Sequence, residues 1–386
     1  MARKSTLNGT GKFILTLCGI WPDASCVLFC RMLWVIASII ILLCHFRYFL
    51  THVYTADFFD LIDCLSSFLA FLKVFVKCLV FWFNQRKFIE ILAIMTNDWK
   101  DCAHSDISMQ KAMSKAKISD RIINGIFILH AMTIVTYCVG LIFADVDVTD
   151  QTTELPHFSK IDIPLDIKTL RVYRLLLITQ FFHLLLCAWM AGITNALLLS
   201  LTLHAGGQFE ILCYWLTQLV PYENENKHKS IVPTTDKIIQ KHQKIIHFAE
   251  KIESLYTYIA LLQFTSNTIM ICTLGFLIVT AIGSPNAIEV IIRSILFYVI
   301  TSLEAFIFCY AGEYLKNKSN AVSLAVYDTP WYNLKPKDSR VLLFIMKRSQ
   351  KQLMLTAGKM MDLSLESFTS IINASGSYLS MLLAMQ

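Results

Sequence analysis

Polar and small side chains recur near the end of the chain at the spacing of one helical face. They are Glu366, Ser370, Asn373, Ser377, Ser380 and Ala384, which follow one another at alternating intervals of four and three residues. On a helix of 3.6 residues per turn this spacing gives a single stripe. Because hydroxyl and amide groups exposed to lipid cost free energy, the stripe is expected to face either other helices or water.

A water-facing stripe would have the chemistry of an ion pathway. One helix cannot enclose a pore, so copies from several subunits would have to surround a common axis. Toward the end of the stripe Met381, Ala384 and Met385 crowd one turn. A ring of such apolar side chains can block ions by excluding water. The alternative is that small and polar residues pack this helix against its neighbours, as they often do in membranes.

A second group of residues suggests a site for a small apolar ligand. The outer halves of four apolar segments are rich in aromatic and small polar residues. These residues are Phe68, Phe71, Leu72 and Phe75; Thr133, Thr136, Tyr137 and Gly140; Ile178, Phe182, His183 and Leu186; and Leu296, Phe297 and Ile300. Such a lining holds a ligand by shape, with few directional hydrogen bonds. Ordinary packing is the commoner explanation for any single residue, so the prediction depends on the set.

Isolated polar residues within the apolar segments have mainly structural explanations. His130 and His183 stand alone, and such histidines are more often packed or hydrogen-bonded than ligand-binding. Lys77 is expected near a membrane surface, where its amine would reach the headgroups. Lys73 lies deeper in the same segment and could pair with Glu304.

The chain carries no pattern that predicts catalysis. It lacks the GxSxG, HExxH and Walker sequences, and its 12 cysteines form no CxxC pair or zinc-like spacing with histidine. We therefore expect neither an enzyme, nor a metal site, nor a cofactor. The net charge of +6 is distributed between apolar runs, so it does not indicate a nucleic-acid partner.

The composition is that of an all-α membrane protein. Hydrophobic residues make up 55% of the chain and charged residues only 16%, whereas soluble domains carry about a quarter charged residues. Apolar runs long enough to cross a hydrocarbon core of about 30 Å must be helices, because backbone amides in lipid pair within their own segment. Seven spans are predicted, at Val27–Leu50, Leu61–Phe83, Ile122–Ala144, Tyr173–Leu203, Tyr256–Ile282, Ile288–Leu315 and Leu363–Met385.

The basic residues predict the orientation of these spans. The connecting segments 84–121, 204–255 and 316–362 hold seven, six and nine Lys and Arg residues, whereas 51–60 and 283–287 hold none. Cytoplasmic segments carry the excess of Lys and Arg, so the amino terminus is expected inside and the carboxyl terminus outside. A G-protein-coupled receptor also has seven helices but begins outside, which argues against that class.

Motifs in the final third make the chain similar to one family. They read FCYAGEYL at 308–315, AVYDTPWY at 325–332, MKRSQ at 346–350, LTAGKMMDLSLESFTSI at 355–371 and SYLSMLLAM at 377–385. In this order and spacing they resemble the insect odorant receptor family. The resemblance is clearest over 293–386, and the number and orientation of the spans extend it over the rest of the chain.

The resemblance implies a tetrameric, odorant-gated, non-selective cation channel in the plasma membrane of olfactory sensory neuron dendrites. An odour-specific subunit joins a shared odorant co-receptor subunit, and a small volatile apolar ligand opens the pore. Pore positions then fall at Ser377, Met381, Ala384 and Met385. Residues 1–203 would hold spans one to four and most of the ligand pocket, 204–315 a cytoplasmic loop with spans five and six, 316–362 a cytoplasmic anchor, and 363–386 the pore helix.

Two departures from related proteins refine the prediction. The segment 204–255 is short, whereas the co-receptor has a long insertion there, so this chain resembles an odour-specific subunit. Ala384 stands where the co-receptor and the related gustatory receptors carry Gln. A gustatory-type ligand-gated channel remains an alternative. A transporter is a further one, although neither internal repeats nor broken helices are evident.

Overall fold

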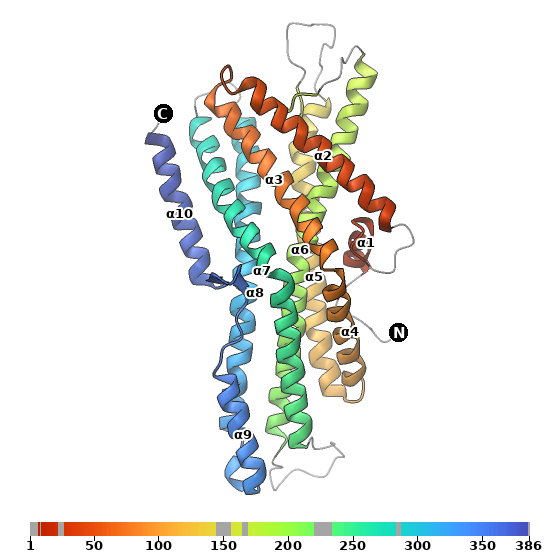
Figure 1. Ribbon diagram of the computed structural model, residues 1–386, viewed down its shortest axis with the longest axis vertical. Helices are drawn as coiled ribbons and strands as arrows, with labels where there is room; N and C mark the ends of the chain where they lie inside the picture. The colour runs from red at the N-terminus through yellow and green to blue at the C-terminus, as the bar shows by residue number, and fades with distance from the viewer. Residues whose placement is uncertain are drawn as a thin grey trace.

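The fold is a bundle of long helices, described by a computed structural model. The described residues are 7, 9–21, 27–143, 156–163, 169–219, 234–282 and 287–384. The helices are α1 (Gly9–Leu17), α2 (Val27–His52), α3 (Phe58–Phe83), α4 (Gln85–Cys102), α5 (Asp106–Phe143), α6 (Leu170–Thr217), α7 (Thr235–Thr280), α8 (Ala287–Asp328), the 3₁₀ helix η1 (Trp331–Asn333), α9 (Pro336–Ser349) and α10 (Leu365–Ala384), with a two-stranded hairpin of β1 (Thr356–Ala357) and β2 (Met361–Asp362). Figure 1 shows them side by side along one long axis.

Six helices in the described part of the chain are long and apolar enough to cross a membrane, namely α2, α3, α5, α6, α7 and α8. They confirm the first six predicted spans as apolar helices. The seventh predicted segment also forms a helix, α10, which is 20 residues long. This helix is not among the six, because its serine-rich composition is more polar.

The segments that connect the predicted spans are largely helical: the helix of the fourth span continues to Thr217 in α6, and α7 begins at Thr235, before the predicted fifth span. The 48 residues of α6 correspond to about 72 Å of helix, more than twice the thickness of a hydrocarbon core. Helix α4 presents Phe88, Ile91, Met95 and Trp99 on one buried face. Hydropathy detects contact with lipid, whereas the apolar face of α4 packs against protein.

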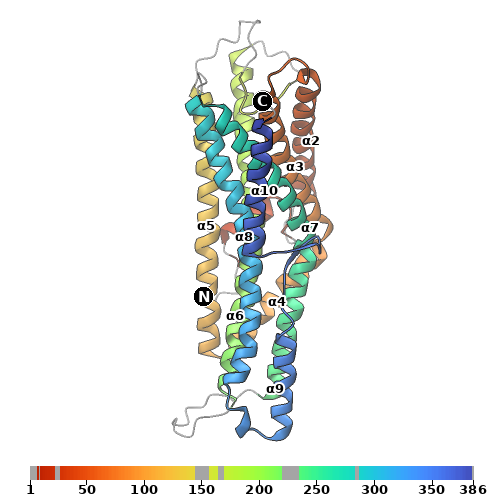
Figure 2. The same cartoon turned by 90° about the vertical axis from the view of Figure 1, so that its left-hand side faces the viewer.

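Helix α6 forms the centre of the bundle. Every residue from Met190 to Phe209 is buried, so this stretch of the helix contacts other helices on all sides. Helices α5, α7 and α8 pack around it, and α2 and α3 cover the upper half (Figures 1 and 2). Small residues permit close approach, since a Cβ on Gly206 would meet the Tyr314 ring and one on Gly192 would meet His130.

A hairpin fixes the start of α10. Gly358 and Lys359 both have φ near 60° and turn the chain between the two strands. The Gly358 amide donates to the Thr257 carbonyl on α7 at 2.8 Å, and the Thr356 amide donates to Glu253 at 2.8 Å. The Ser364 hydroxyl then accepts from the Ser367 amide at 3.1 Å, as a helix N-cap does. The hairpin therefore ties α10 to α7 before α10 runs back up the bundle (Figure 1).

Candidate functional site

A cavity lies between the upper parts of α3, α5, α6, α7 and α8. Its empty volume is about 980 Å³, including the open space at its mouth. Each helix contributes residues at helical spacing, such as His130, Thr133, Ile134 and Tyr137 from α5. Aromatic and aliphatic side chains form most of the wall. A concave and largely apolar site with a few polar groups is the usual form of a small-molecule pocket.

Two ion pairs between α3 and α8 bound this cavity. Arg293 lies 2.7 Å from Asp63, and Lys73 lies 2.6 Å from Glu304. Both helices begin at the upper end of the bundle (Figure 1), so each pair joins residues at matching heights. Ten residues separate Asp63 from Lys73, which corresponds to about 15 Å of helix. The four charges therefore lie at two levels of the cavity and neutralise one another there.

The lower ion pair belongs to a buried polar network. The Gln263 amide donates to Glu304 at 2.7 Å and to Asn267 at 2.7 Å, and Asn267 also accepts from Lys73 at 3.2 Å. The Asn267 amide donates to the Thr301 carbonyl at 3.1 Å. This network stabilises the charges away from water and joins α3, α7 and α8 below the ligand space.

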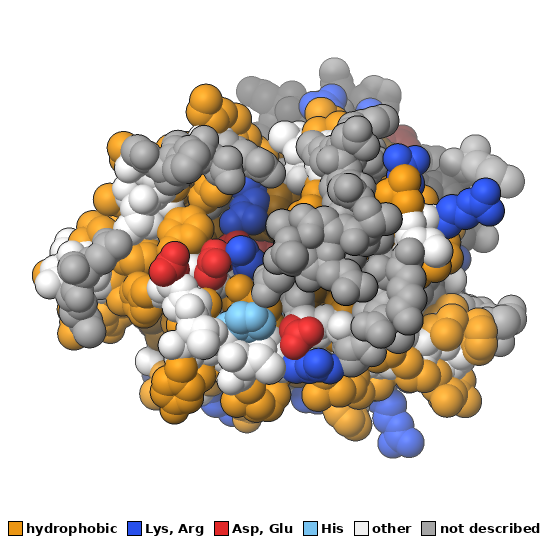
Figure 3. All heavy atoms as spheres, turned by 90° about the horizontal axis from the view of Figure 1, so that it is seen from above, with side chains coloured by type: hydrophobic (Ala, Val, Ile, Leu, Met, Phe, Trp, Pro, Cys, Tyr) orange, Lys and Arg blue, Asp and Glu red, His pale blue; other side chains and the backbone are white. Residues whose placement is uncertain are grey.

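The upper side of the cavity is covered by the described segment 156–163. Ser159 lines the cavity, and Lys160 pairs with Asp60 at 3.0 Å. Asp162 pairs with Arg47 of α2 at 2.9 Å. Figure 3 shows acidic, basic and histidine side chains gathered among hydrophobic ones at this end of the molecule. Two ion pairs with partly exposed side chains therefore hold this segment against α2 and α3.

The structure brings five of the predicted pocket residues to the cavity. They are Phe71, Thr133, Tyr137, Phe297 and Ile300. Nine of the others, which belong to the same helices, do not line it, namely Phe68, Leu72, Phe75, Thr136, Ile178, Phe182, His183, Leu186 and Leu296. The surroundings of Gly140 lie outside what the structure describes. Ile178 and Phe182 are 48% and 58% exposed, because apolar side chains occur on the lipid-facing and cavity-facing sides of a membrane helix alike.

His183 lies behind the cavity wall. Its ring stacks on Phe71, with 5.7 Å between centroids, and on Trp34 at 5.8 Å. It therefore supports a wall residue, as expected for a packed histidine. His130 is buried and lines the cavity.

The predicted pairing of Lys73 with Glu304 is confirmed, but the prediction for Lys77 was wrong. Lys77 does not reach a membrane surface; it is fully buried, and its amine donates to Asn195 at 3.1 Å. Lys73 and Lys77 are four residues apart, so they share the inward face of α3. Both amines consequently point into the bundle.

Sequence reasoning missed several residues of the cavity. They include Asp63, Ser66, Ala191, Met270, Leu274, Arg293 and Ser294. The signal for two of them was present, because Asp63 and Arg293 are charged residues within or beside apolar segments, where charges mark functional or paired sites. The small and aliphatic members of the set carry no such signal.

Helix α10 has one packed side and one exposed side. Phe368, Ile372, Leu379, Leu382 and Leu383 are packed against the bundle, whereas Leu365 at the start of the helix is 41% exposed. The residues of the polar stripe are all exposed, and Met381 is 63% exposed. The alternative in which the stripe packs against other helices of the same chain is therefore wrong. Met385 lies outside the described residues.

The contacts of α10 lead directly to the cavity. Leu379 packs on Gly275 of α7, where an added Cβ would lie 3.0 Å from the leucine side chain. The preceding residue, Leu274, lines the cavity. Leu274 and Leu379 belong to one apolar cluster with Phe297, another cavity residue. Two residues of the cavity wall therefore share their packing with the exposed helix.

A separate buried charge cluster stabilises the lower bundle. Asp98 of α4 accepts from His204 at 3.1 Å and lies 3.0 Å from Lys244 and 3.5 Å from Lys241. Burial by itself raises the pKa of Asp98, but the His204 hydrogen bond and the lysine charges outweigh burial and hold this pKa well below its usual value. The cluster fixes α4 against α6 and α7.

Comparison with known proteins identifies the family. The family model for the 7tm odorant receptor matches residues 57–376. Odorant receptor 13a of Drosophila melanogaster is 24% identical over 382 residues, covering 94% of this chain and 89% of the relative. Odorant receptor 10 of Aedes albopictus is 34% identical over 161 residues, covering 42% of this chain and 41% of the relative.

Solved structures agree with this assignment at the level of the fold. The insect olfactory receptor OR5 from Machilis hrabei, solved in complex with eugenol, superimposes with a TM-score of 0.79 at 15% identity, covering 98% of this chain and 97% of that one. The chain therefore has the insect olfactory receptor fold and belongs to the odorant receptor family. It is a multi-pass membrane receptor and not an enzyme.

Proposed function

We propose that this chain is the odour-specific subunit of an odorant-gated, non-selective cation channel that it forms with the shared co-receptor subunit. A small volatile would bind in the cavity between α3, α5, α6, α7 and α8, and α10 would line the pore together with α10 helices of the other subunits. The observation that carries this proposal is the exposed polar stripe of α10. No other part of the described chain packs over its Ser370, Ser377 and Ser380 side chains.

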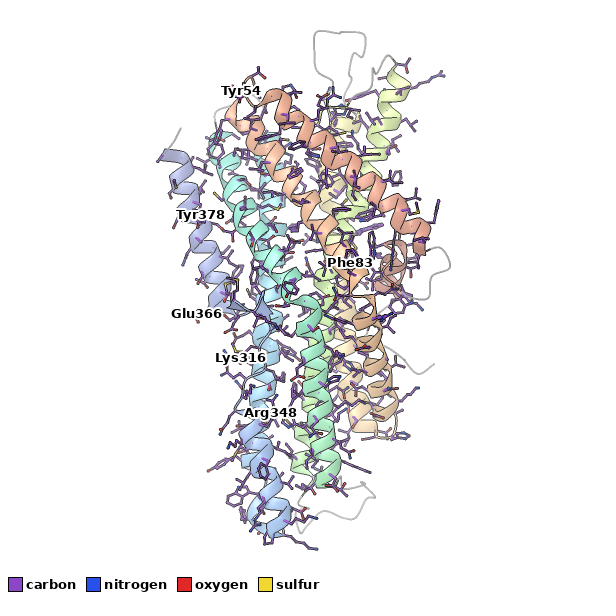
Figure 4. The ribbon with its side chains drawn as sticks, viewed as in Figure 1. Tyr54, Phe83, Lys316, Arg348, Glu366 and Tyr378 are labelled. Carbon is purple, nitrogen blue, oxygen red and sulfur yellow. The ribbon has the colours of Figure 1, made fainter. Side chains whose placement is uncertain are left out.

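The dimensions of α10 support a crossing of the membrane. Twenty residues correspond to about 30 Å of helix, which matches a hydrocarbon core. Figure 4 places Glu366, at the start of α10, near mid-height, and Tyr378 higher on the same helix. Lys316 and Arg348 lie in the lower half, below that start. The positive-inside rule then makes the lower half cytoplasmic and the carboxyl end of α10 extracellular.

The surface of the lower half supports assembly with other subunits. Large apolar side chains are exposed there on α8, η1 and α9, namely Leu324, Tyr327, Trp331, Tyr332, Leu343 and Phe344, at 45–73% of their surface. This part extends below the start of α10, so lipid does not cover it. Exposed apolar patches of this kind mark protein interfaces. We propose that residues 316–362 act as the cytoplasmic anchor between subunits.

The proposed gating step uses the cluster that joins the cavity to α10. A ligand that binds the open state more tightly than the closed state shifts the population toward the open state. Its contacts with Leu274 and Phe297 would move the packing surface on which Leu379 rests. Met381 and its neighbours would then withdraw from the pore axis and admit water and cations.

The test is co-expression with the co-receptor in cells, followed by measurement of membrane currents during exposure to a panel of volatiles. We expect inward cation currents that require both subunits and that fall when Phe297 is changed to alanine. An amino-terminal epitope tag is expected to be inaccessible on intact cells and a carboxyl-terminal tag accessible. Surface expression of both subunits without a current from any volatile would contradict the proposal. The proposed location is the plasma membrane of olfactory sensory neuron dendrites.

A further inference from the structure

A second hollow lies lower on the molecule, where the hairpin meets α7. This hairpin groove is lined by α7, by the hairpin and the segment before it, and by single residues of α4 and α8. Its empty volume is about 840 Å³, including the space at its open side, and it shares no residue with the ligand cavity. Its charged residues are Lys87, Glu250, Glu253 and Lys359, and its apolar residues include Leu315 and Leu355.

The hairpin groove lies at the level where α7 changes from a charged helix to an apolar one. Charged residues recur along α7 up to Glu253, and none follows from Ser254 to Thr280. Figure 4 places Glu366, in the first turn of α10, near mid-height, directly after the hairpin. Because the headgroup layer of a bilayer adjoins its hydrocarbon core, the groove opens at the level of the cytoplasmic headgroups.

The charges of the groove follow a vertical order along α7. Lys359 comes directly after Gly358, whose amide donates to the Thr257 carbonyl at 2.8 Å. The Lys87 amine donates to the Ser254 carbonyl at 3.3 Å. Glu250 lies four residues before Ser254, which corresponds to about 6 Å along the helix toward the cytoplasmic end. Two ammonium groups are therefore held on the membrane side of this carboxylate.

Two charges of the groove are left without a partner. Glu253 is held by the hairpin, since it accepts from the amide and the hydroxyl of Thr356. Lys359 and Glu250 are exposed, and neither forms an ion pair or a side-chain hydrogen bond within the described part of the chain. Lys359 also has φ of 59°, a conformation that is unfavourable for lysine and that is found most often at binding sites.

An apolar strip continues from the groove along the membrane part of α7. Leu261 and Ile269 are 37% and 40% exposed, and Thr265 between them is also exposed. Their spacing of four residues places them on one face of the helix. This strip has the length and character of a contact surface for an acyl chain that leaves the groove toward the centre of the bilayer.

We propose that the hairpin groove binds the headgroup of a zwitterionic phospholipid of the cytoplasmic leaflet. Its phosphate contacts Lys87 and Lys359, and its ammonium group lies below the phosphate at Glu250. In such a lipid the acyl chains and the ammonium group leave the phosphate in opposite directions, so the order of groups matches the order of charges along α7. A phosphatidylglycerol headgroup has no ammonium group and would leave Glu250 without a partner beside an added negative charge. The proposal rests on the orientation inferred above and does not require that the protein conducts ions.

The experiment is photo-crosslinking of the full-length chain, purified in detergent together with the co-receptor. The probe is phosphatidylethanolamine with a diazirine on an acyl chain close to the glycerol, and labelled peptides are located by mass spectrometry. We expect labelling within residues 249–261 and 353–361. Unlabelled phosphatidylethanolamine and phosphatidylcholine should compete better than phosphatidylglycerol with the same acyl chains. Water-soluble glycerophosphoethanolamine, which supplies the headgroup alone, should compete poorly.

Substitutions of the two unpaired charges sharpen the test. Lys359→Gln should weaken competition by every phospholipid about threefold, as expected for one exposed charge pair. Glu250→Gln should remove the preference for zwitterionic lipids over phosphatidylglycerol without abolishing labelling. Lys347→Gln is the matched control, because Lys347 is an exposed lysine of α9 that does not line the groove. It should change neither the labelling nor the preference.

Three results would overturn the lipid site: competition by phosphatidylglycerol or by the soluble headgroup that equals competition by phosphatidylethanolamine, unchanged labelling and competition in Lys359→Gln, or labelling of the exposed face of α2 without labelling of the groove. The last result would mean that a neighbouring subunit covers the groove. Current recordings separate this inference from the proposed function. Labelling with the expected preference but no current contradicts the channel proposal alone, and currents from a complex whose groove is not labelled contradict the lipid site alone.

Discussion

Lys73 of α3 and Glu304 of α8 form an ion pair below the ligand cavity, with 2.6 Å between Nζ and Oε2 and no more than 5% of either side chain exposed. Gln263 and Asn267 of α7 bond to the same pair. The ion pair and its partners therefore join α7, on which α10 packs, to α3 and α8, which form two walls of the cavity. Movements of α3 and α8 around a ligand must be accommodated by this network.

Removing one partner of this pair should lower the free energy of unfolding much more than removing both partners. Glu304→Leu leaves the Lys73 amine buried without a counter-ion and should reduce the free energy of unfolding by about 3–5 kcal/mol. Lys73→Met combined with Glu304→Leu should recover most of that loss, since apolar replacements of a buried pair are often nearly neutral. Thermal unfolding of the four proteins of the double-mutant cycle measures the coupling. Additive losses would contradict a direct interaction.

Leu379 should transmit ligand binding to α10. Leu379→Ala removes contacts with Gly275 while leaving the cavity wall intact. We expect the maximal current at saturating ligand to fall several-fold and the affinity of the purified chain for the ligand to stay within about twofold, since ligand contacts are unchanged. Leu343→Ala, at an exposed site on α9, serves to separate assembly effects from gating effects. An unchanged maximal current in Leu379→Ala would exclude this route.

The Asp98 cluster predicts how stability depends on pH. The pKa of Asp98 is lowered in the folded state, so its contribution is present above the unfolded value of 3.8 and is lost as pH falls through the folded pKa. Stability should therefore be insensitive to this group between pH 7 and pH 5 and should fall only in stronger acid. Unfolding midpoints measured from pH 7 to below the unfolded pKa of 3.8 check both parts of this expectation.

Two substitutions in α4 test the same cluster. Asp98→Asn should destabilise the protein at neutral pH by about 3 kcal/mol, because Lys241 loses its counter-ion, and should flatten the acid limb. Glu90→Gln is the control, since Glu90 is an exposed partner of Lys251 and surface pairs contribute little. Equal acid sensitivity of Asp98→Asn and the parent protein would show that other carboxylates set the acid limb.

Particular residues show what the sequence could and could not predict. A lone lysine in an apolar segment requires a partner, which led to the pairing of Lys73 with Glu304. The prediction that Lys77 reaches a membrane surface was wrong, because position along a span does not indicate that the residue lies on the inward face of its helix. Ile178 and Phe182 have residue types that suit a pocket, but residue type does not separate a lipid-facing from a cavity-facing side chain. Ser294 and Leu274 could be found only from the packing of five helices.

The helices beyond the membrane were missed for a different reason. Helix α4 and the lower part of α8 carry charged residues besides apolar ones, and a search for apolar runs reads them as polar segments. Their periodicity was present in the sequence, as Phe88, Ile91, Met95 and Trp99 illustrate. The polar stripe of α10 could be predicted because its polar residues recur with helical periodicity.

Met381 should influence the conducted ions. Met381 is 63% exposed on α10, and a charged side chain there would stand in the proposed pathway. Met381→Glu should increase basal leak and raise the preference for cations over anions, because rings of carboxylates attract cations. Reversal potentials in different salts measure this preference. Tyr258→Glu is the comparison at an exposed site of α7 and should leave ion preference unchanged.

The most direct test of the account is chemical modification of Ser377→Cys in the complex with the co-receptor. Ser377 belongs to the exposed stripe of α10, whereas Leu383 lies on its packed side. A charged, water-soluble thiol reagent applied outside should irreversibly alter the ligand-evoked current of Ser377→Cys, faster when ligand is present, and leave Leu383→Cys and the parent unchanged. Labelling of Ser377→Cys without any change in current, or failure of the reagent to reach it in the open channel, would contradict a water-filled pore along α10.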